Sequence, residues 1–104
     1  MSRKKELDNI ASFIGNAAAH AALLPEDKFA QKEVGTYSSE ATDIFIAKHW
    51  NDEELKYLKS KALAKARAEI RSRIPKYGLM EKDFERFSKT AEEFIERFIR
   101  QAKN

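Results

Sequence analysis

The sequence contains no cysteine, and only three glycines and two prolines occur among its 104 residues. The absence of cysteine excludes disulfide bonds, thiolate metal sites, iron–sulfur clusters and a cysteine nucleophile. The scarcity of glycine and proline argues against fibrous, low-complexity and turn-rich all-β chains. With 42% hydrophobic and 36% charged residues, the composition is typical of a soluble helical protein, and we expect a single domain over residues 1–104.

Charged residues are missing from one stretch, between Asn9 and Pro25. Because Arg3, Lys4 and Lys5 precede this stretch, a secretory signal peptide is the first interpretation to consider. Polar residues interrupt the run, however, and it falls short of the ~20 strongly apolar residues that a membrane span requires. We therefore expect a cytoplasmic protein with no membrane segment and no membrane partner.

Strand-like alternation is absent as well, and apolar residues recur instead at the spacings of three and four that indicate helices. Pro25 ends the first helix, and Gly35 ends a short helical turn or ordered loop that precedes the second. The expected helices span residues 7–24, 37–49, 52–74 and 79–102. We predict an all-α fold, a small four-helix bundle with three long amphipathic helices and one short helix.

The start of the third helix carries the clearest local signal. Asn51 is an N-cap residue, Glu54 stands at the third helical position of a capping box, and Trp50 and Leu55 occupy the positions of a hydrophobic staple. The Trp50–Asn51 corner is too tight for an ordinary antiparallel hairpin, so a bend is expected there. Pro75 disfavours helical geometry in the residue before it and predicts the end of this helix.

The helical faces predict a core and an outer surface. The last helix places acid–base pairs at a spacing of four on its outer face, with Glu85/Lys89, Glu93/Arg97 and Glu96/Arg100 in the favourable order. The predicted core consists of Leu7, Ile10, Ile14, Ile44, Phe45, Leu55, Leu58, Leu63, Ile70, Phe84, Phe87, Phe94 and Phe98.

The uncharged first helix carries a polar but neutral stripe of Asn9, Ser12, Asn16 and His20, opposite its aliphatic face. Amides and hydroxyls can be buried against another helix without the desolvation of a charge. Two interpretations follow. The helix is either the central one of the monomer, or its neutral stripe is a surface for self-association or for a partner.

The third helix is strongly basic. Residues 55–76 contain eight bases and one acid, although the whole chain carries a net charge of only +3. Lysines beside an apolar stripe usually pack their stems and keep their charges in water. If the segment binds RNA or DNA instead, phosphate contacts would come from its C-terminal half, because acids head the helix. The candidate residues are Arg67, Arg71, Arg73 and Lys76.

Catalytic signatures are lacking, with no phosphate loop, nucleophile elbow or zinc-protease motif. Neither histidine, His20 or His49, has a glutamate three residues before it, as a di-iron bundle requires. The acid pairs Glu40/Asp43 and Glu93/Glu96 could in principle hold magnesium, but helix starts and outer faces commonly carry such acids. We predict no catalytic, cofactor or metal site.

These patterns favour a non-enzymatic helical interaction module. Its first expected partner is a second copy of the chain, or another protein, bound through the neutral stripe of the first helix. The alternative is a weakly sequence-specific RNA- or DNA-binding protein that uses the basic third helix.

Overall fold

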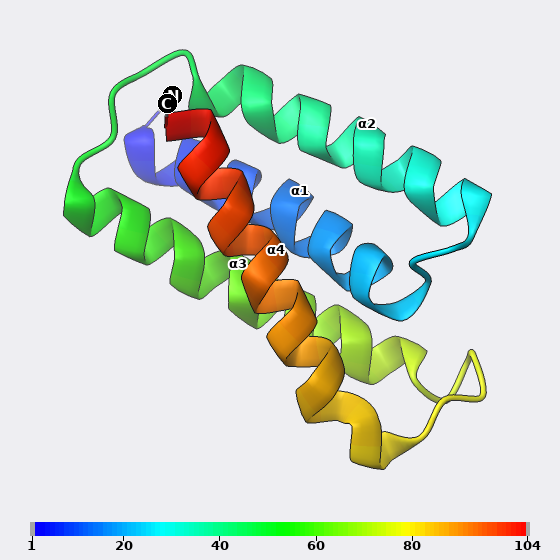
Figure 1. The fold of residues 1–104 in the computed structure, drawn as a ribbon. Helices are drawn as coiled ribbons and strands as arrows, with labels where there is room; N and C mark the ends of the chain where they lie inside the picture. The colour runs from blue at the N-terminus through cyan, green and yellow to red at the C-terminus, as the bar shows by residue number, and fades with distance from the viewer. Residues whose placement is uncertain (1, 104) are drawn as a thin grey trace.

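A computed structural model of the chain describes residues 2–103 and confirms the all-α prediction. Four helices follow one another, and each reverses the direction of the one before it (Figure 1). A single 3₁₀ turn, η1, precedes the last helix. The elements are α1 (Arg3–Leu23), α2 (Lys28–Phe45), α3 (Asp52–Arg73), η1 (Glu81–Asp83) and α4 (Phe84–Lys103).

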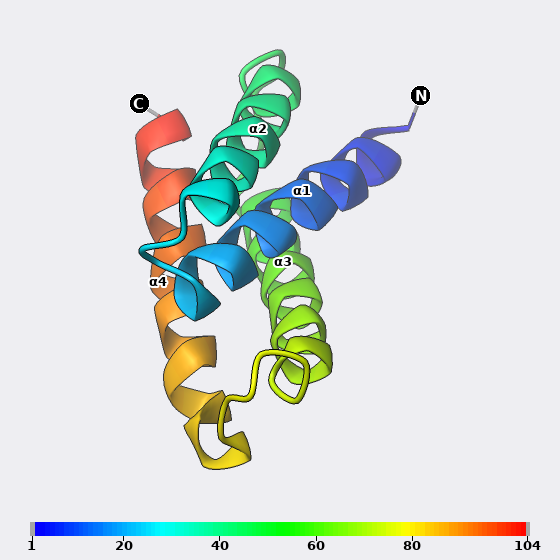
Figure 2. The same cartoon turned by 90° about the vertical axis from the view of Figure 1, so that its right-hand side faces the viewer.

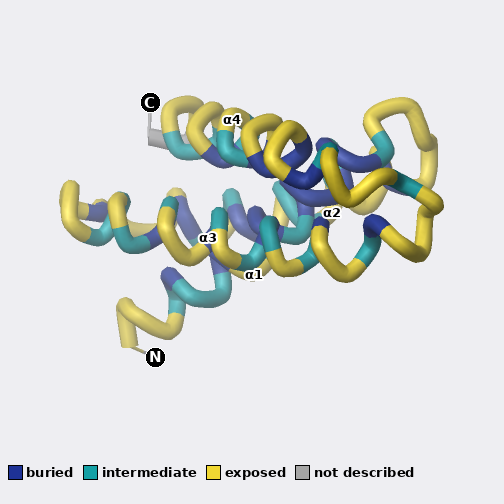
Figure 3. Tube along the Cα trace, turned by 90° about the horizontal axis from the view of Figure 1, so that it is seen from below, coloured by how far each residue is buried: buried dark blue, intermediate teal, exposed yellow. Residues whose placement is uncertain are grey.

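The central element is α1, which packs against each of the three other long helices (Figure 2). It lies between α2 and α3, while α3 and α4 also pack on each other. By contrast, α2 makes extensive contact with α1 alone. More than half of the residues in α1 are buried, whereas the other helices keep a broad exposed side (Figure 3).

The second helix is longer than the expected span of residues 37–49, and it begins and ends earlier. Asp27 caps it, because its carboxylate accepts a hydrogen bond from the Ala30 amide at 2.9 Å. Gly35, expected to end a short helical turn or ordered loop, lies inside the helix, with open space where a Cβ atom would stand. Contact with α1 through Ala30, Ala41 and Phe45 outweighs the low helix propensity of glycine.

The connections of α3 match the sequence signals at one end and differ at the other. The capping box of Asn51 and Glu54 is present, and the helix ends at Arg73, shortly before Pro75. The expected bend at the Trp50–Asn51 corner is wrong, because residues 46–51 form a connection that passes the start of α1 and reverses the chain. After α3, Gly78 adopts a positive φ of 68°, which glycine tolerates best.

The core centres on α1 and on the facing sides of α3 and α4. Eight of the predicted core residues are buried: Leu7, Ile10, Ile14, Phe45, Leu58, Ile70, Phe84 and Phe87. The other five, Ile44, Leu55, Leu63, Phe94 and Phe98, are only partly buried. In α4 the largest fully buried side chain is Ile95, which the predicted core did not include, while Phe94 and Phe98 are only partly buried. The buried stripe of the helix is therefore rotated toward Ile95.

Close approach of α1 and α3 depends on Gly15. A Cβ atom at this position would lie 2.7 Å from two side-chain carbons of Lys65 and 2.8 Å from the Ala62 carbonyl oxygen. The backbone oxygen cannot move away without a shift of α3. The absence of a side chain at Gly15 therefore sets the distance between the two helices.

Substitution of this glycine tests the packing. Gly15→Ala should lower the free energy of unfolding by about 1–3 kcal/mol, because it overpacks the contact between α1 and α3. Gly35→Ala is the matched control, and it should raise stability by about 0.5–1 kcal/mol because no neighbour opposes the added methyl group. Chemical denaturation of both variants provides the measurement. Equal effects of the same sign would show that Gly15 is not a contact point.

The inner face of α4 can be tested at Phe87, whose side chain is buried. Phe87→Ala should cost about 3–5 kcal/mol of stability, because it removes apolar contacts and leaves a cavity. Phe29→Ala should change stability by less than about 0.5 kcal/mol, because the Phe29 side chain is 83% exposed. If Phe87→Ala left the denaturation midpoint unmoved, the inner face of α4 would be assigned wrongly.

Candidate interaction groove

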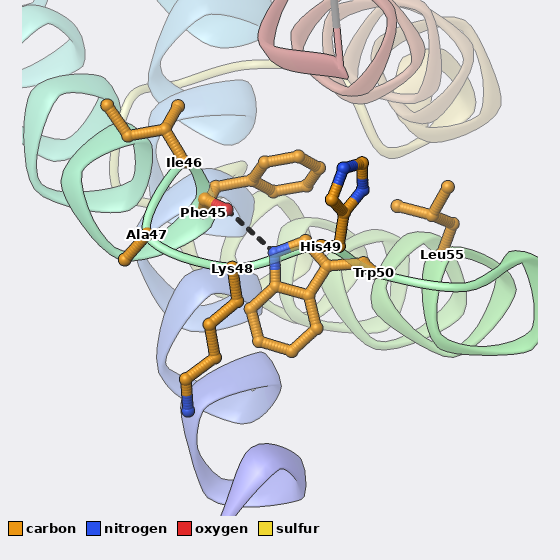
Figure 4. Close-up of a pocket in the computed structure, with 7 residues that line it drawn as sticks. All are labelled: Phe45, Ile46, Ala47, Lys48, His49, Trp50 and Leu55. Atoms are coloured by element: carbon orange, nitrogen blue, oxygen red, sulfur yellow. Dashed lines mark hydrogen bonds between the residues drawn. The ribbon is translucent and has the colours of Figure 1, made fainter.

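A groove crosses one end of the bundle, where the connection between α2 and α3 approaches the last turns of α4. It consists of two hollows of about 410 and 450 Å³, which adjoin at Leu55. Residues 45–50 and Leu55 line the first hollow (Figure 4). The second lies between α3 and α4, and its further lining residues are Asp52, Lys56, Lys59, Glu96, Ile99 and Arg100. We call the two hollows together the corner groove.

The wall of the first hollow is built around Trp50, which is 9% exposed. Its indole N–H donates a 2.7 Å hydrogen bond to the Phe45 carbonyl oxygen at the end of α2 (Figure 4). The Phe45 ring lies tilted against the indole, with 6.3 Å between ring centroids, and meets the Phe98 ring of α4 edge-on at 5.6 Å. These contacts hold the end of α2 against the start of α3 and the end of α4.

The first turn of α1 fastens the connection that forms this wall. Arg3 donates one hydrogen bond to the His49 carbonyl oxygen at 2.6 Å and two to the Glu54 carboxylate at 2.8 and 3.0 Å. Its guanidinium also stacks over the Trp50 ring, 4.7 Å from the centroid. Lys48 forms an ion pair with Glu6. The groove is therefore preformed rather than assembled from a free loop.

Apolar and basic side chains share the rim of the corner groove. Ile46 is 63% exposed, and Leu55 and Ile99 are partly buried. On α3, Lys59 pairs with Glu96 at 3.2 Å and with Glu92 at 3.8 Å. Within the described residues, no ion pair engages Lys56 on the α3 wall or Arg100 on the α4 wall.

The structure does not place the four residues of the neutral stripe on one open surface. Ser12 is exposed and Asn9 and Asn16 are partly buried, but His20 is 7% exposed beneath α2. The His20 ring lies 2.8 Å from the Asn16 carbonyl oxygen through Nδ1, and 2.9 Å from the Glu33 carboxylate through Nε2. His20 therefore joins α1 to α2 within the monomer.

Of the four candidate nucleic-acid residues, three guanidinium groups are engaged by acids of the same chain. Arg67 contacts Glu85 at 3.3 Å, Arg71 contacts Glu81 at 3.1 Å, and Arg73 pairs with Glu69. Lys76 is exposed. The structure thus does not bring the four bases together as a free cluster.

The ring of Phe84 explains part of this arrangement. Arg71 stacks over it at 4.0 Å and Arg67 at 4.9 Å, measured from each guanidinium carbon to the ring centroid. Stacked guanidinium groups gain both packing and cation–π attraction. These arginines therefore join α3 to the beginning of α4.

None of the three expected acid–base pairs along α4 forms among the described residues, and two of their acids pair with α3 instead. Glu85 reaches Arg67, and Glu96 reaches Lys59, both on α3. Five of the eight bases in residues 55–76 have an acid partner as a result: Lys59, Lys65, Arg67, Arg71 and Arg73. Lys65 and Arg73 share Glu69 of the same segment, so the fold brings acids from outside the segment to three of the eight bases and offsets part of its charge surplus.

Sequence reasoning identified Trp50, Leu55 and the capping box but missed the groove that they border. It placed Ile46 inside a helix, and it had no means to pair Arg3 with Glu54, which lies 51 residues away. The partial exposure of Ile99 was also unforeseen. The hydrophobic staple at Trp50 and Leu55 was the one signal that pointed to this corner.

In the part of the chain that the structure describes, no group of three or more histidines and carboxylates is placed to hold a metal ion. Glu40 and Asp43 lie exposed on α2, while Glu93 and Glu96 lie exposed on α4. Among residues 2–103, no helix has the length and apolar character needed to cross a membrane.

The fold and groove define a small all-α helical-bundle protein with a preformed surface hollow. No protein-family model, curated protein or solved structure matches the chain. The groove and the surfaces around it therefore carry the functional argument.

Acid titration tests the contacts of Glu54 that hold the wall of the groove in place. Hydrogen bonds from Arg3 and from the Asn51 amide lower the pKa of Glu54 to about 2, from 4.5. Because the folded pKa is below the unfolded value, the stabilisation is present above about pH 4.5 and is lost as pH falls toward about 2. Glu54→Gln should therefore be less stable at neutral pH and should lose stability less steeply across that window.

Arg3→Met provides the partner for a double-mutant cycle, measured by thermal unfolding at several pH values. The free energy of unfolding lost in the double variant should be smaller than the sum of the losses in the two single variants, because each substitution removes the same interaction. Strict additivity at neutral pH would contradict the coupling of Arg3 to Glu54.

Proposed function

We propose that this protein is a non-enzymatic binding module that holds an amphipathic helix of a partner protein in the corner groove. The observation that carries the proposal is the preformed pair of hollows, with an apolar middle and a basic residue on each wall. The partner helix has apolar residues on one face and acidic residues on both flanks.

The shape of the groove favours a helix over an extended peptide. Extended peptides commonly add to the edge of a sheet, and the described residues form helices and their connections only. A groove between two helices instead accepts apolar anchors that recur every three or four residues on a third helix. Leu55 and Ile99, one on each wall, supply the apolar contacts for such anchors.

Exposed apolar side chains around the groove favour the binding of a partner helix that would cover them. Ile46 stands 63% exposed beside the first hollow, and Phe94, Phe98 and Ile99 of α4 are only partly covered. Exposed apolar patches with polar rims commonly mark interaction sites. A docked helix would cover these side chains in the way that α1 covers the rest of α4.

The charges on the rim select the partner. Among the described residues, Lys56 and Arg100 have no acid partner and stand on opposite walls. Of the two acids that line the same hollow, Glu96 is paired with Lys59, and Asp52 stands in the first turn of α3. Acidic residues on both flanks of the incoming helix would complement them. Such charge pairs determine orientation and partner choice more than they determine affinity.

Self-association through the neutral stripe is a weaker proposal. Ser12, its most exposed member, borders a small hollow of about 180 Å³ together with Lys61 and Lys65. Asp8 also borders this hollow, and Lys65 is paired with Glu69, so Lys61 is its unpaired base among the described residues. In a two-fold dimer with Ser12 on the axis, Lys61 would approach its own copy. This repulsion favours a different protein as the partner.

The test uses a synthetic helical peptide with leucines at i, i+4 and i+7 and glutamates on both flanks. Trp50 is the only tryptophan of the chain and lines the groove, so its fluorescence reports binding. We expect a saturable change with a Kd in the micromolar range, weakened roughly tenfold when lysines replace the glutamates. The double variant Lys56→Glu/Arg100→Glu should reverse this preference.

Lys61→Glu is the matched control, because Lys61 lies beside Ser12 on another face. It should leave peptide binding unchanged. Equal affinity for both peptides, or no saturation below ~1 mM, would contradict the proposal. Sedimentation equilibrium that shows a dimer which Ser12→Arg dissociates, together with no peptide binding, would support self-association through the stripe instead.

A further inference from the structure

The side of α2 that faces away from α1 is open to solvent. In Figure 1, α2 forms the upper edge of the bundle, and its extensive contacts are with α1 alone. Exposed residues recur on its free side at spacings of three and four, the period of one helical face. We call this surface the outer face of α2, and it consists of Lys28, Phe29, Lys32, Thr36, Ser39, Glu40, Asp43 and Ile46.

Charges on the outer face of α2 are separated by sign along the helix. The bases Lys28 and Lys32 stand one turn apart in its N-terminal half, and the acids Glu40 and Asp43 stand in its C-terminal half. All four side chains are exposed, and none takes part in an ion pair within residues 2–103. Neighbouring charges on this face are therefore of the same sign, which disfavours an isolated helix.

The helix dipole makes this order of charges unfavourable for α2 on its own. A helix carries partial positive charge at its N-terminus and partial negative charge at its C-terminus, so acids are favoured at the start and bases at the end. On the outer face of α2 both are reversed. Apart from the N-cap Asp27, no acid stands in the first turn and no base in the last. A second helix that runs antiparallel to α2 would bring opposite charges to both ends.

An exposed apolar side chain stands at each end of the same face. Phe29 is 83% exposed at the start of α2, and Ile46 is 63% exposed at its C-cap. These are the two most exposed large hydrophobic side chains of the described residues. Phe29 borders a hollow of about 330 Å³ together with Lys32 and Thr36, so the three side chains lie on one side of the helix. Ile46 continues the helical spacing three residues after Asp43.

We propose that two copies of the chain associate through the outer face of α2, with the two helices antiparallel about a two-fold axis. A two-fold interface brings the same surface of both copies together, so that surface must be complementary to itself. The antiparallel arrangement meets this condition, because the basic half of each helix lies beside the acidic half of the other. A parallel arrangement would place bases against bases and acids against acids.

One register of the two helices matches all parts of the outer face. When the two-fold axis passes the middle of α2, a base faces an acid, the exposed apolar side chains face each other, and short side chains meet near the axis. The facing pairs, one residue from each copy, are Lys32 with Asp43, Phe29 with Ile46, and Thr36 with Ser39. Short side chains at the centre of the contact allow two helices to pack closely.

The small size of the contact determines the affinity that we expect. The 18 residues of α2 give a contact that is about 27 Å long. Interfaces at the lower end of the size range form weak complexes. We therefore expect a dissociation constant of about 10–100 µM. Association should weaken as salt is added, because the facing charges are exposed.

This association is separate from the binding of a helix in the corner groove. Ile46 is the one residue that belongs to both surfaces, so the variants that test the dimer leave it unchanged. Lys56 and Arg100, which determine the expected peptide preference, lie outside the outer face of α2. A monomeric chain that binds the peptide would overturn the association alone, whereas a dimer that binds no peptide would overturn the helix-binding function alone.

The experiment is sedimentation equilibrium of the full chain between about 10 and 500 µM. We expect a monomer–dimer equilibrium for the wild type. Lys28→Glu/Lys32→Glu and Glu40→Lys/Asp43→Lys should each weaken the dimer at least about tenfold, because like charges then face each other. An equimolar mixture of these two variants should form a dimer again. The variant with all four changes keeps the net charge of the wild type and should also dimerise, because each half again meets its opposite.

Lys61→Glu/Lys89→Glu is the matched control, because it makes the same change in net charge as Lys28→Glu/Lys32→Glu but lies outside α2. It should leave the dimer unchanged, and circular dichroism should show that every variant keeps its helices. A wild type that is still monomeric at about 500 µM would overturn the proposal. An equal loss in the control, or a variant with all four changes that stays monomeric, would overturn it too. A dimer that Ser12→Arg dissociates would place the contact at the neutral stripe and would likewise overturn it.

Discussion

The burial of α1 on three sides is the constraint on which the rest of the structure depends. A helix surrounded by others must carry no charge, because a buried charge without a partner is costly. The run from Asn9 to Pro25 meets this condition, and Gly15 lets α3 approach the backbone of α1. The three other helices are arranged around this one, so their mutual contacts are secondary.

The corner groove is a consequence of that arrangement. Because α2 is bound mainly to α1, it leaves the end of α4 partly uncovered, and the Phe45–Phe98 contact bridges the two helices there. The Arg3 contacts then hold the connecting loop in place. A gap in helix packing thus becomes a surface of defined shape, which is what a binding module requires.

Ion pairing between helices explains why the bases of α3 do not form one free cluster. Acids of η1 and of the first turn of α4 engage Arg67 and Arg71 in the last turns of α3, and Phe84 stacks against the same guanidinium groups. At the corner groove, Lys59 is paired with Glu96, whereas Lys56 and Arg100 have no acid partner among the described residues. The proposed function uses this contrast, because the unpaired bases border the groove.

The sequence by itself determined the features that depend on near neighbours along the chain. These are the helical class, the start of α3 at the capping box, its end before Pro75, and most of the inner faces. Capping and amphipathic periodicity act within a few residues, so a sequence pattern can predict them. Such a local pattern could not predict the extension of α2 through Gly35, because this extension depends on contact with α1.

Only the tertiary structure decided which groups remain free. The pairing of Arg3 with Glu54, the burial of His20 beneath α2 and the exposure of Phe29 all depend on residues distant in sequence. The basic segment looked like one site in the sequence, but the fold pairs Lys59, Arg67 and Arg71 with acids of η1 and α4. The surfaces proposed for binding consist of side chains that helix packing leaves exposed and that ion pairing leaves free. Long-range contacts determine which side chains these are.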